Sequence, residues 1–164
     1  MSRITSLLII LALLLAFSGC GNKTESLEQP ASFYYILETA ENSMFEAEVR
    51  EIKPFSDDYL AIANHYFNGP SSDTYVNVFP AGLRAVSQEC IDDKLQITVS
   101  DELSNLSYVE QSIACACMGM TLLELTGCAE IVIRMENRTF DGKESITLQL
   151  DDLYLFDSTL TVSK

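Results

Sequence analysis

Short runs of apolar residues, most of them alternating with polar ones, predict six β-strands. The six segments are residues 33–37, 45–50, 83–91, 94–100, 129–136 and 146–150. A period of two is typical of a strand that has one wet face. It is clearest in residues 94–100 and in residues 45–50, where three apolar residues alternate with three charged ones. The third and fourth segments flank Asp92-Asp93, and we expect them to form a hairpin.

The apolar spacing changes to that of a helix in two places. The first helix follows Ser56, a good N-cap residue, and should stop at Asn68-Gly69-Pro70. The second begins with a capping box, in which Ser107 and Glu110 satisfy each other's backbone donors, and closes at Gly127. The chain therefore contains two predicted helices, each placed between pairs of strands.

The order of these elements, β-β-α-β-β-α-β-β, predicts an α+β fold. No connection is long enough for a doubly wound parallel architecture. We expect a two-layer sandwich, in which both helices pack on one face of a mostly antiparallel sheet.

The N-terminus has the layout of a bacterial export signal. Arg3 precedes an apolar run at residues 7–17, which is too short to cross a bilayer as a mature helix. The Ser-Gly-Cys ending resembles a lipobox, in which Cys20 would be acylated and become the new N-terminus. Phe17 departs from that pattern, since lipoboxes usually have an aliphatic residue there. A plain secretory peptide is the alternative interpretation.

We expect four regions along the chain: a lipoprotein signal peptide at 1–19, a flexible tether at 20–32, a single domain at 33–157 and a C-terminal tail at 158–164. The tether is polar and aperiodic. The domain is large enough to bury a proper core.

The formal charge of −14 argues against several kinds of partner. So acidic a chain repels the phosphates of nucleic acids and anionic lipid headgroups, and it has no Lys/Arg cluster to compensate. A covalent lipid on Cys20 would therefore have to hold the domain at the membrane, and a diacylated cysteine supplies enough acyl chain for stable attachment. We expect a lipid-anchored protein on the extracytoplasmic face of the cell membrane.

Four cysteines lie within the predicted domain: Cys90, Cys115, Cys117 and Cys128. They form no CxxC pair, and the chain has one histidine, so we expect no zinc site. Cys115 and Cys117 would point to opposite sides of the second helix. Export would permit disulfides, but buried free thiols fit the pattern as well, and the sequence leaves the choice open.

The second helix has no charge between Ile113 and Met120. We expect its core stripe to be formed by Val109, Ile113, Cys117, Met120 and Leu123. A second strip is left on another side, formed by Ala114, Cys115, Met118 and Leu122. This strip either packs against the first helix or forms an exposed contact surface for self-association or another envelope protein.

Little in the sequence predicts catalysis, and we expect no enzyme, cofactor or metal site. His65 is the one histidine, and no serine lies in a Gly-x-Ser-x-Gly elbow. The acidic pairs at 57–58, 92–93 and 151–152 lack the pattern of a calcium loop. Five aromatic residues could form a platform for cell-wall glycan, although such residues are more often core. They are Tyr34, Tyr35, Tyr66, Phe67 and Tyr75.

Four short motifs occur in the order and spacing of a known family. They are Tyr-Phe-Asn-Gly-Pro at 66–70, Val-Phe-Pro-Ala-Gly at 78–82, Ile-Thr-Val-Ser-Asp-Glu-Leu at 97–103, and Thr-Leu-Leu-Glu-Leu at 121–125 followed by Ile-Val-Ile at 131–133. Over roughly residues 33–155 the chain resembles the GerMN domain of sporulation and spore-germination proteins. Many members of that family carry two copies or a second module, and this chain has room for one copy.

The resemblance implies an exported, non-enzymatic module of the bacterial cell envelope, with a role in sporulation or germination. Our expectation is therefore a lipid-anchored binding or scaffold module. The alternatives are an enzyme or accessory of cell-wall metabolism and a substrate-binding lipoprotein. The second of these normally needs two lobes.

Overall fold

The computed structural model describes residues 29–38, 43–52, 59–151 and 153. It contains all six predicted strands and both predicted helices, together with a two-residue strand and a 3-10 helix. The first strand begins at Gln29, so residues 29–32 of the expected flexible tether belong to the sheet instead. The elements are β1 (Gln29–Glu38), β2 (Ser43–Ile52), α2 (Tyr59–Phe67), β3 (Tyr75–Val76), β4 (Ala85–Ile91), β5 (Lys94–Val99), η1 (Asp101–Asn105), α3 (Tyr108–Thr126), β6 (Glu130–Met135) and β7 (Ser145–Gln149). The predicted N-cap Ser56 and the lipidation candidate Cys20 lie outside the described residues.

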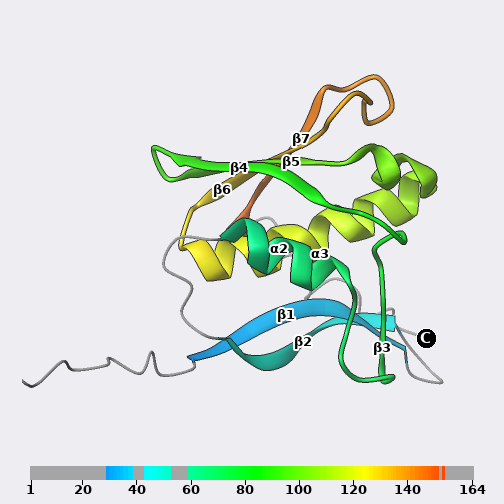
Figure 1. Ribbon diagram of the computed structural model, residues 1–164, viewed down its shortest axis with the longest axis vertical. Coiled ribbons are helices and arrows are strands. Elements are labelled where there is room, and N and C mark those ends of the chain that lie inside the picture. Colours follow the sequence, from blue (N-terminus) through cyan, green and yellow to red (C-terminus); the bar gives the residue numbers. More distant parts are fainter. Residues whose placement is uncertain (1–28, 39–42, 53–58, 152, 154–164) are drawn as a thin grey trace, which may run out of the picture.

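The fold is α+β, as expected, but its strands form two sheets. One has the order β2-β1-β3 and the other β4-β5-β6-β7. Every strand pair in the described chain is antiparallel except β5–β6. Both helices lie between the two sheets (Figure 1), so the arrangement has three layers rather than the expected two. Periodicity indicates which residues of one strand share a face, but it does not indicate which strands pair.

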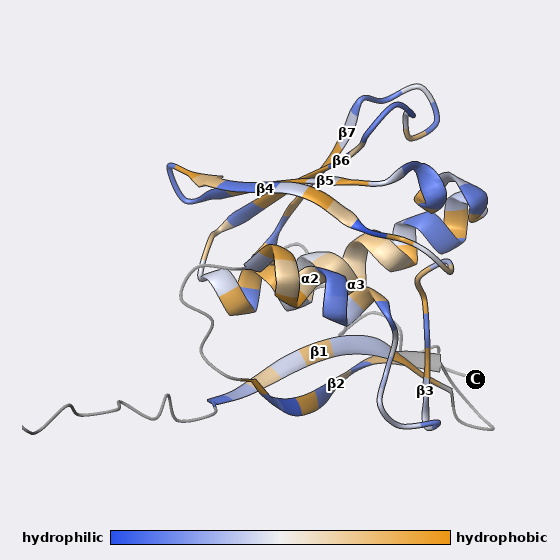
Figure 2. Cartoon of the chain, in the orientation of Figure 1, coloured by the Kyte–Doolittle hydropathy of each residue, from blue (hydrophilic) through white to orange (hydrophobic). Residues whose placement is uncertain are grey.

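Helix α3 is the centre of this arrangement. Its residues from Ala114 to Leu123 are all buried, as expected of a helix that is hydrophobic all round and enclosed by other layers. Figure 2 shows this uncharged middle in pale and orange shades. The helix contacts β1 on one side and β6 and β7 on the other. The middle of α3 therefore carries no charge because a sheet covers the helix on each side.

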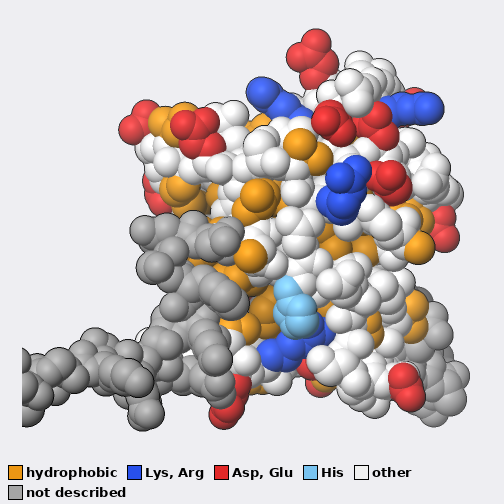
Figure 3. Space-filling model, in the orientation of Figure 1, with side chains coloured by type: hydrophobic (Ala, Val, Ile, Leu, Met, Phe, Trp, Pro, Cys, Tyr) orange, Lys and Arg blue, Asp and Glu red, His pale blue; other side chains and the backbone are white. Residues whose placement is uncertain are grey.

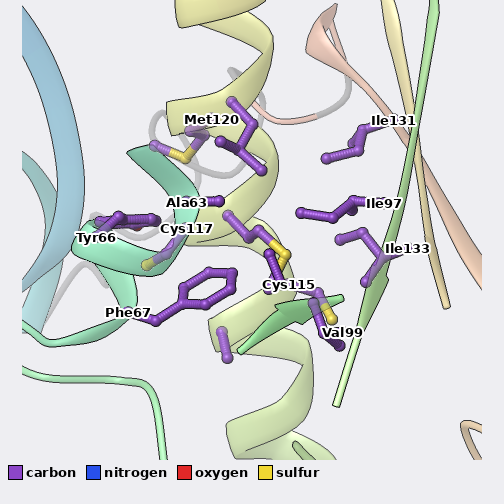
Figure 4. Close-up of a cluster of buried hydrophobic side chains, with 14 of the residues drawn as sticks. Ala63, Tyr66, Phe67, Ile97, Val99, Cys115, Cys117, Met120, Ile131 and Ile133 are labelled. Carbon is purple, nitrogen blue, oxygen red and sulfur yellow. The ribbon is translucent and has the colours of Figure 1, made fainter. Parts of the chain in front are cut away.

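The prediction of an exposed strip on α3 is wrong. Its four members are 0–1 % exposed: Ala114, Cys115, Met118 and Leu122. Val109, which we expected in the core stripe, is 66 % exposed, because it lies in the first turn of α3, where the layers no longer cover the helix. Cys115 and Cys117 point to opposite sides, the first toward Val99 and Ile133 and the second toward α2 (Figure 4).

Gly119 allows α3 to lie close to the larger sheet. A Cβ at this position would come within 3.0 Å of Leu153 Cδ1 and 3.1 Å of Leu148 Cδ1. These are tighter than ordinary van der Waals contacts, so the neighbouring leucines would have to move to accommodate even alanine.

The predicted boundaries of α3 and of the β4–β5 hairpin are confirmed. The Ser107 hydroxyl accepts the Glu110 N–H, and the Glu110 carboxylate accepts the Ser107 N–H at 2.8 Å. Gly127 ends the helix at φ +71°. Asp92 and Asp93 form the hairpin turn at φ +49° and +65°, a left-handed conformation that two-residue hairpins require.

Candidate functional site

Strand β2 turns two of its charged residues, Glu48 and Arg50, toward the core. Glu48 is 8 % exposed, whereas its neighbour Val49 is 66 % exposed. Opposite residues of an antiparallel pair project to the same side of the sheet, and Glu48 lies opposite the fully buried Phe33. The usual interpretation of the alternation in residues 45–50 places Val49 in the core, and the structure shows the reverse.

Aromatic rings and a carboxylate make this inversion favourable for Arg50. Its guanidinium carbon lies 4.8 Å from the ring centroid of Phe33 and 5.4 Å from that of Tyr35. The guanidinium pairs with Glu48 and donates to the Tyr35 hydroxyl at 2.9 Å and to the Gly69 carbonyl at 3.0 Å. Stacking on aromatic faces and paired hydrogen bonds both suit a planar guanidinium.

Glu48 connects this cluster to the loop that follows α2. Its carboxylate accepts the backbone N–H groups of Ser71 and Ser72, each at 3.0 Å. Burial raises the pKa of Tyr35 to about 12 despite the opposing effect of Arg50, so its phenol stays neutral and donates to the Tyr66 carbonyl at 3.0 Å. The cluster is satisfied internally, and we interpret it as structural.

The consequence is an apolar surface on the opposite side of β1 and β2, which we call the outer face. The pairing register places six uncharged residues on it: Tyr34, Ile36, Phe45, Ala47, Val49 and Val76. The same register places the exposed Glu51 on this side, at the end of β2. Val49 and Val76 are exposed and the other four are half-buried. The helices lie on the other side of β1 and β2 (Figure 1).

The outer side of the larger sheet is different in character. Residues that alternate with the buried Leu95 and Ile97 of β5 are polar, and they include Gln96 and Thr98. Arg134 of β6 is opposite Thr98 and is exposed. This side also carries Val132 and the exposed Ile91, but polar residues predominate on it. Of the two outward sheet surfaces the outer face is therefore the more apolar one, and it is the candidate contact surface.

Side chains of both helices close one edge of β1. The Tyr34 N–H donates to the Thr121 hydroxyl at 2.9 Å, and the Tyr66 hydroxyl donates to the Tyr34 carbonyl. Glu124 accepts the hydroxyl groups of Ser32 at 2.8 Å and Tyr34 at 3.0 Å. The backbone groups of Tyr34 are thus paired, and β2 lies at the other edge of this sheet.

The remaining candidates from the sequence do not come together as a site. His65 is exposed on α2 (Figure 3), and in the described part of the chain its imidazole makes no hydrogen bond or ion pair. Asp92 and Asp93 are exposed in their turn. Asp57, Asp58 and Asp152 lie outside the described residues, and Asp151 is exposed. Among the residues that the structure describes, no cluster of three or more metal-binding side chains occurs.

The five aromatic residues do not form an exposed platform, and for three of them the core interpretation is confirmed. Tyr35, Tyr66 and Phe67 are buried, and the ring centroids of Tyr66 and Phe79 are 4.7 Å apart. Aromatic pairs at such separations stabilise a core by more than their buried area alone provides.

No helix in the described part of the chain has both the length and the hydropathy to span a membrane.

Sequence-based reasoning missed the outer face, although a signal was present. Alternation in residues 45–50 distinguishes two sets of side chains, and either set can face inward. The presence of Phe33 and Tyr35 on the neighbouring strand, where an arginine can stack, was the available indication.

Comparison with solved structures identifies the fold. No protein-family model and no curated protein matches the sequence. The first GerMN domain of the sporulation protein GerM from Bacillus subtilis superposes with a TM-score of 0.57 and 16 % identity, over 76 % of this chain and 99 % of that one. The tandem GerMN domains of the same protein give a TM-score of 0.60 and 18 % identity, over 77 % of this chain and 47 % of that one. This chain spans about half the length of the tandem structure, and its described domain has a GerMN-like fold.

Proposed function

We propose that this protein is a lipid-anchored scaffold module on the extracytoplasmic face of a bacterial cell membrane, and that two copies bind each other through the outer face. The observation that carries the proposal is the inversion of β2, which exposes Val49 while Glu48 is buried. We propose further that the module serves in spore formation or germination, because the similar GerMN domains belong to a sporulation protein.

Two observations and the proposed lipid anchor favour a second copy as the occupant of the outer face. The six central residues of that face carry no charge, and the exposed carboxylate of Glu51 lies beside them at the end of β2, so two copies of this acidic chain can meet through the six residues with little direct charge opposition. The tandem structure places two domains of this fold in one chain, and a single domain of this fold can obtain a second by association. A lipid anchor also confines copies to a membrane surface, where weak contacts become effective.

Sedimentation equilibrium of the mature lipidated chain in mild detergent tests the association. Val49→Glu places a charge in the outer face, and we expect it to weaken self-association by about tenfold or more. Val109→Glu is the matched control, because Val109 is equally exposed but lies on α3. Association that is absent in the wild type, or equal in both variants, would contradict the proposal.

Fractionation of cells tests the anchor separately. Cys20→Ser removes the acylation site, so the protein should either appear in the soluble fraction or accumulate as uncleaved precursor. A Cys20→Ser protein that is processed and membrane-bound to the wild-type extent would end the lipoprotein assignment. This outcome would leave the association result standing.

A further inference from the structure

Two cysteines from distant parts of the chain meet at one end of the larger sheet. Cys90 lies near the end of β4, and Cys128 follows the C-terminus of α3. Their Sγ atoms are 2.8 Å apart. A disulfide bond is about 2.05 Å long, so a movement of less than about 1 Å would bring the sulfurs to bonding distance.

The backbone holds the two residues in this position. Cys90 pairs with Leu95 of β5, and Leu95 pairs with Ile131 of β6. Leu95 is fully buried against the helices, so Cys90, which is opposite, projects toward the same side. The Ala129 N–H donates to the Asp93 carbonyl at 3.0 Å, which fixes the residue after Cys128 to the β4–β5 turn.

The other two cysteines of the domain are not competitors for either sulfur. Cys115 and Cys117 are buried within α3 and point to opposite sides (Figure 4). Burial raises the pKa of Cys115 to about 12 and that of Cys117 further. Because the thiolate is the reactive form, both are inert.

Cys90 and Cys128 differ in accessibility in a way that suits oxidation. Cys90 is exposed and borders a surface hollow lined by Tyr59 and Leu60 of α2. Cys128 is 3 % exposed. An external oxidant therefore reaches Cys90 first, and Cys128 is already beside it.

We propose that Cys90 and Cys128 form an intramolecular disulfide, made by exchange with the disulfide form of an extracytoplasmic thiol oxidoreductase. The Cys90 thiolate attacks the oxidant's disulfide and forms a mixed disulfide. The Cys128 thiolate then attacks the Cys90 sulfur and releases the oxidant as a dithiol. The thiols of Cys90 and Cys128 together lose two electrons and two protons, and the oxidant's disulfide gains them. This inference rests on the proposed export, since cytosolic thiols are kept reduced.

The bond would join the end of edge strand β4 to the connection between α3 and β6. It would enclose β5, η1 and α3 in one covalent loop. Loops of this length stabilise a fold mainly by restricting its unfolded state. We expect the oxidised protein to melt about 10 °C above the reduced protein.

Oxidation of the purified, reduced full chain with oxidised glutathione tests the bond without depending on cell location. After alkylation of free thiols, mass spectrometry should find Cys90 and Cys128 linked in one peptide pair, while Cys115 and Cys117 are alkylated once the protein is unfolded. Cys90→Ala and Cys128→Ala should each abolish the redox-dependent rise in melting temperature, and Cys115→Ala should retain it.

Two results would overturn the inference: alkylation of both Cys90 and Cys128 after oxidation, or the same redox-dependent rise in Cys90→Ala as in the wild type. A second sample, alkylated directly in cells that make the protein, tests export. If Cys90 and Cys128 are linked in the purified chain but are free thiols in those cells, the exported protein does not carry the disulfide. The closeness of the two sulfurs would still be confirmed. Sedimentation equilibrium of Cys90→Ala measures self-association separately, and we expect it to equal that of the wild type.

Discussion

At the scale of single residues, Arg50 determines which side of β2 faces the core. An arginine on an inner face requires partners for its charge and its donors, and the chain supplies them from Glu48, Tyr35 and Gly69. Removing one member of a buried ion pair costs more than removing both, because the remaining charge is left without compensation.

Glu48→Ala should therefore lower the free energy of unfolding by about 3 kcal/mol. It removes the counter-charge of Arg50 and the acceptor for the Ser71 and Ser72 N–H groups. Urea denaturation measures the loss. The double variant Glu48→Leu/Arg50→Met is the control and should lose less than Glu48→Ala, because it leaves no unpaired charge. A single variant within about 0.5 kcal/mol of the wild type would show that the pair does not hold β2 in place.

At the scale of elements, the sequence predicts both ends of α3 correctly, but it does not predict which elements pack around the helix. The capping box and Gly127 mark its ends by local chemistry, which depends on a few neighbouring residues. Which sides are covered depends on β1, which ends 70 residues before α3 begins. Local patterns cannot report that placement, and the exposed strip was the resulting error.

Burial of the α3 strip predicts a large effect of charge. Met118→Glu should cost about 4 kcal/mol or more, because an unpaired carboxylate would be placed among apolar side chains. Val109→Glu on the same helix should stay within about 0.5 kcal/mol of the wild type, since Val109 is exposed. Thermal or urea unfolding of both variants measures the difference. A Met118→Glu domain as stable as Val109→Glu would contradict the enclosed position of α3.

The capping box predicts a dependence of stability on pH. Hydrogen bonds from Ser107, first from its side chain and then from its backbone, lower the pKa of Glu110 below its ordinary value of 4.5. The ionised Glu110 carboxylate therefore stabilises the folded protein above pH 4.5. This stabilisation is lost as the pH falls through the pKa that Glu110 has in the folded state.

Glu110→Gln keeps a side-chain acceptor at this position but does not titrate. The wild type should therefore lose stability relative to Glu110→Gln between pH 6 and pH 3, as urea denaturation at each pH would show. Parallel curves for the two proteins would mean that the capping carboxylate is not coupled to folding.

The strands show how far periodicity extends and where it stops. In β5 the alternation of Leu95, Ile97 and Val99 with polar residues gave the buried face correctly. In β2 an equally clean alternation had the opposite orientation, because aromatic rings on β1 accommodate Arg50. The difference lies in a neighbouring strand, so single-strand periodicity could not reveal it. The candidate surface was missed for the same reason.

At the scale of the whole molecule, the helices occupy the space between two sheets, so each sheet has one outward side. The larger sheet presents polar residues such as Gln96 and Arg134, and the smaller one presents the apolar outer face. An acidic domain held at a membrane by lipid would thus have one side suited to apolar contact. The proposed scaffold function depends on that asymmetry.

Photo-crosslinking in intact membranes is the most direct measurement of this proposal. The lipidated full chain is made with p-benzoylphenylalanine at position 49, on the outer face, or at position 96, on the polar side of the larger sheet. Irradiation should give a covalent dimer of the chain from position 49 and none from position 96, with mass spectrometry identifying the outer face of the second copy in the crosslink. Dimers from position 96 alone, or none from position 49 when the protein is correctly folded and anchored, would contradict self-association through the outer face.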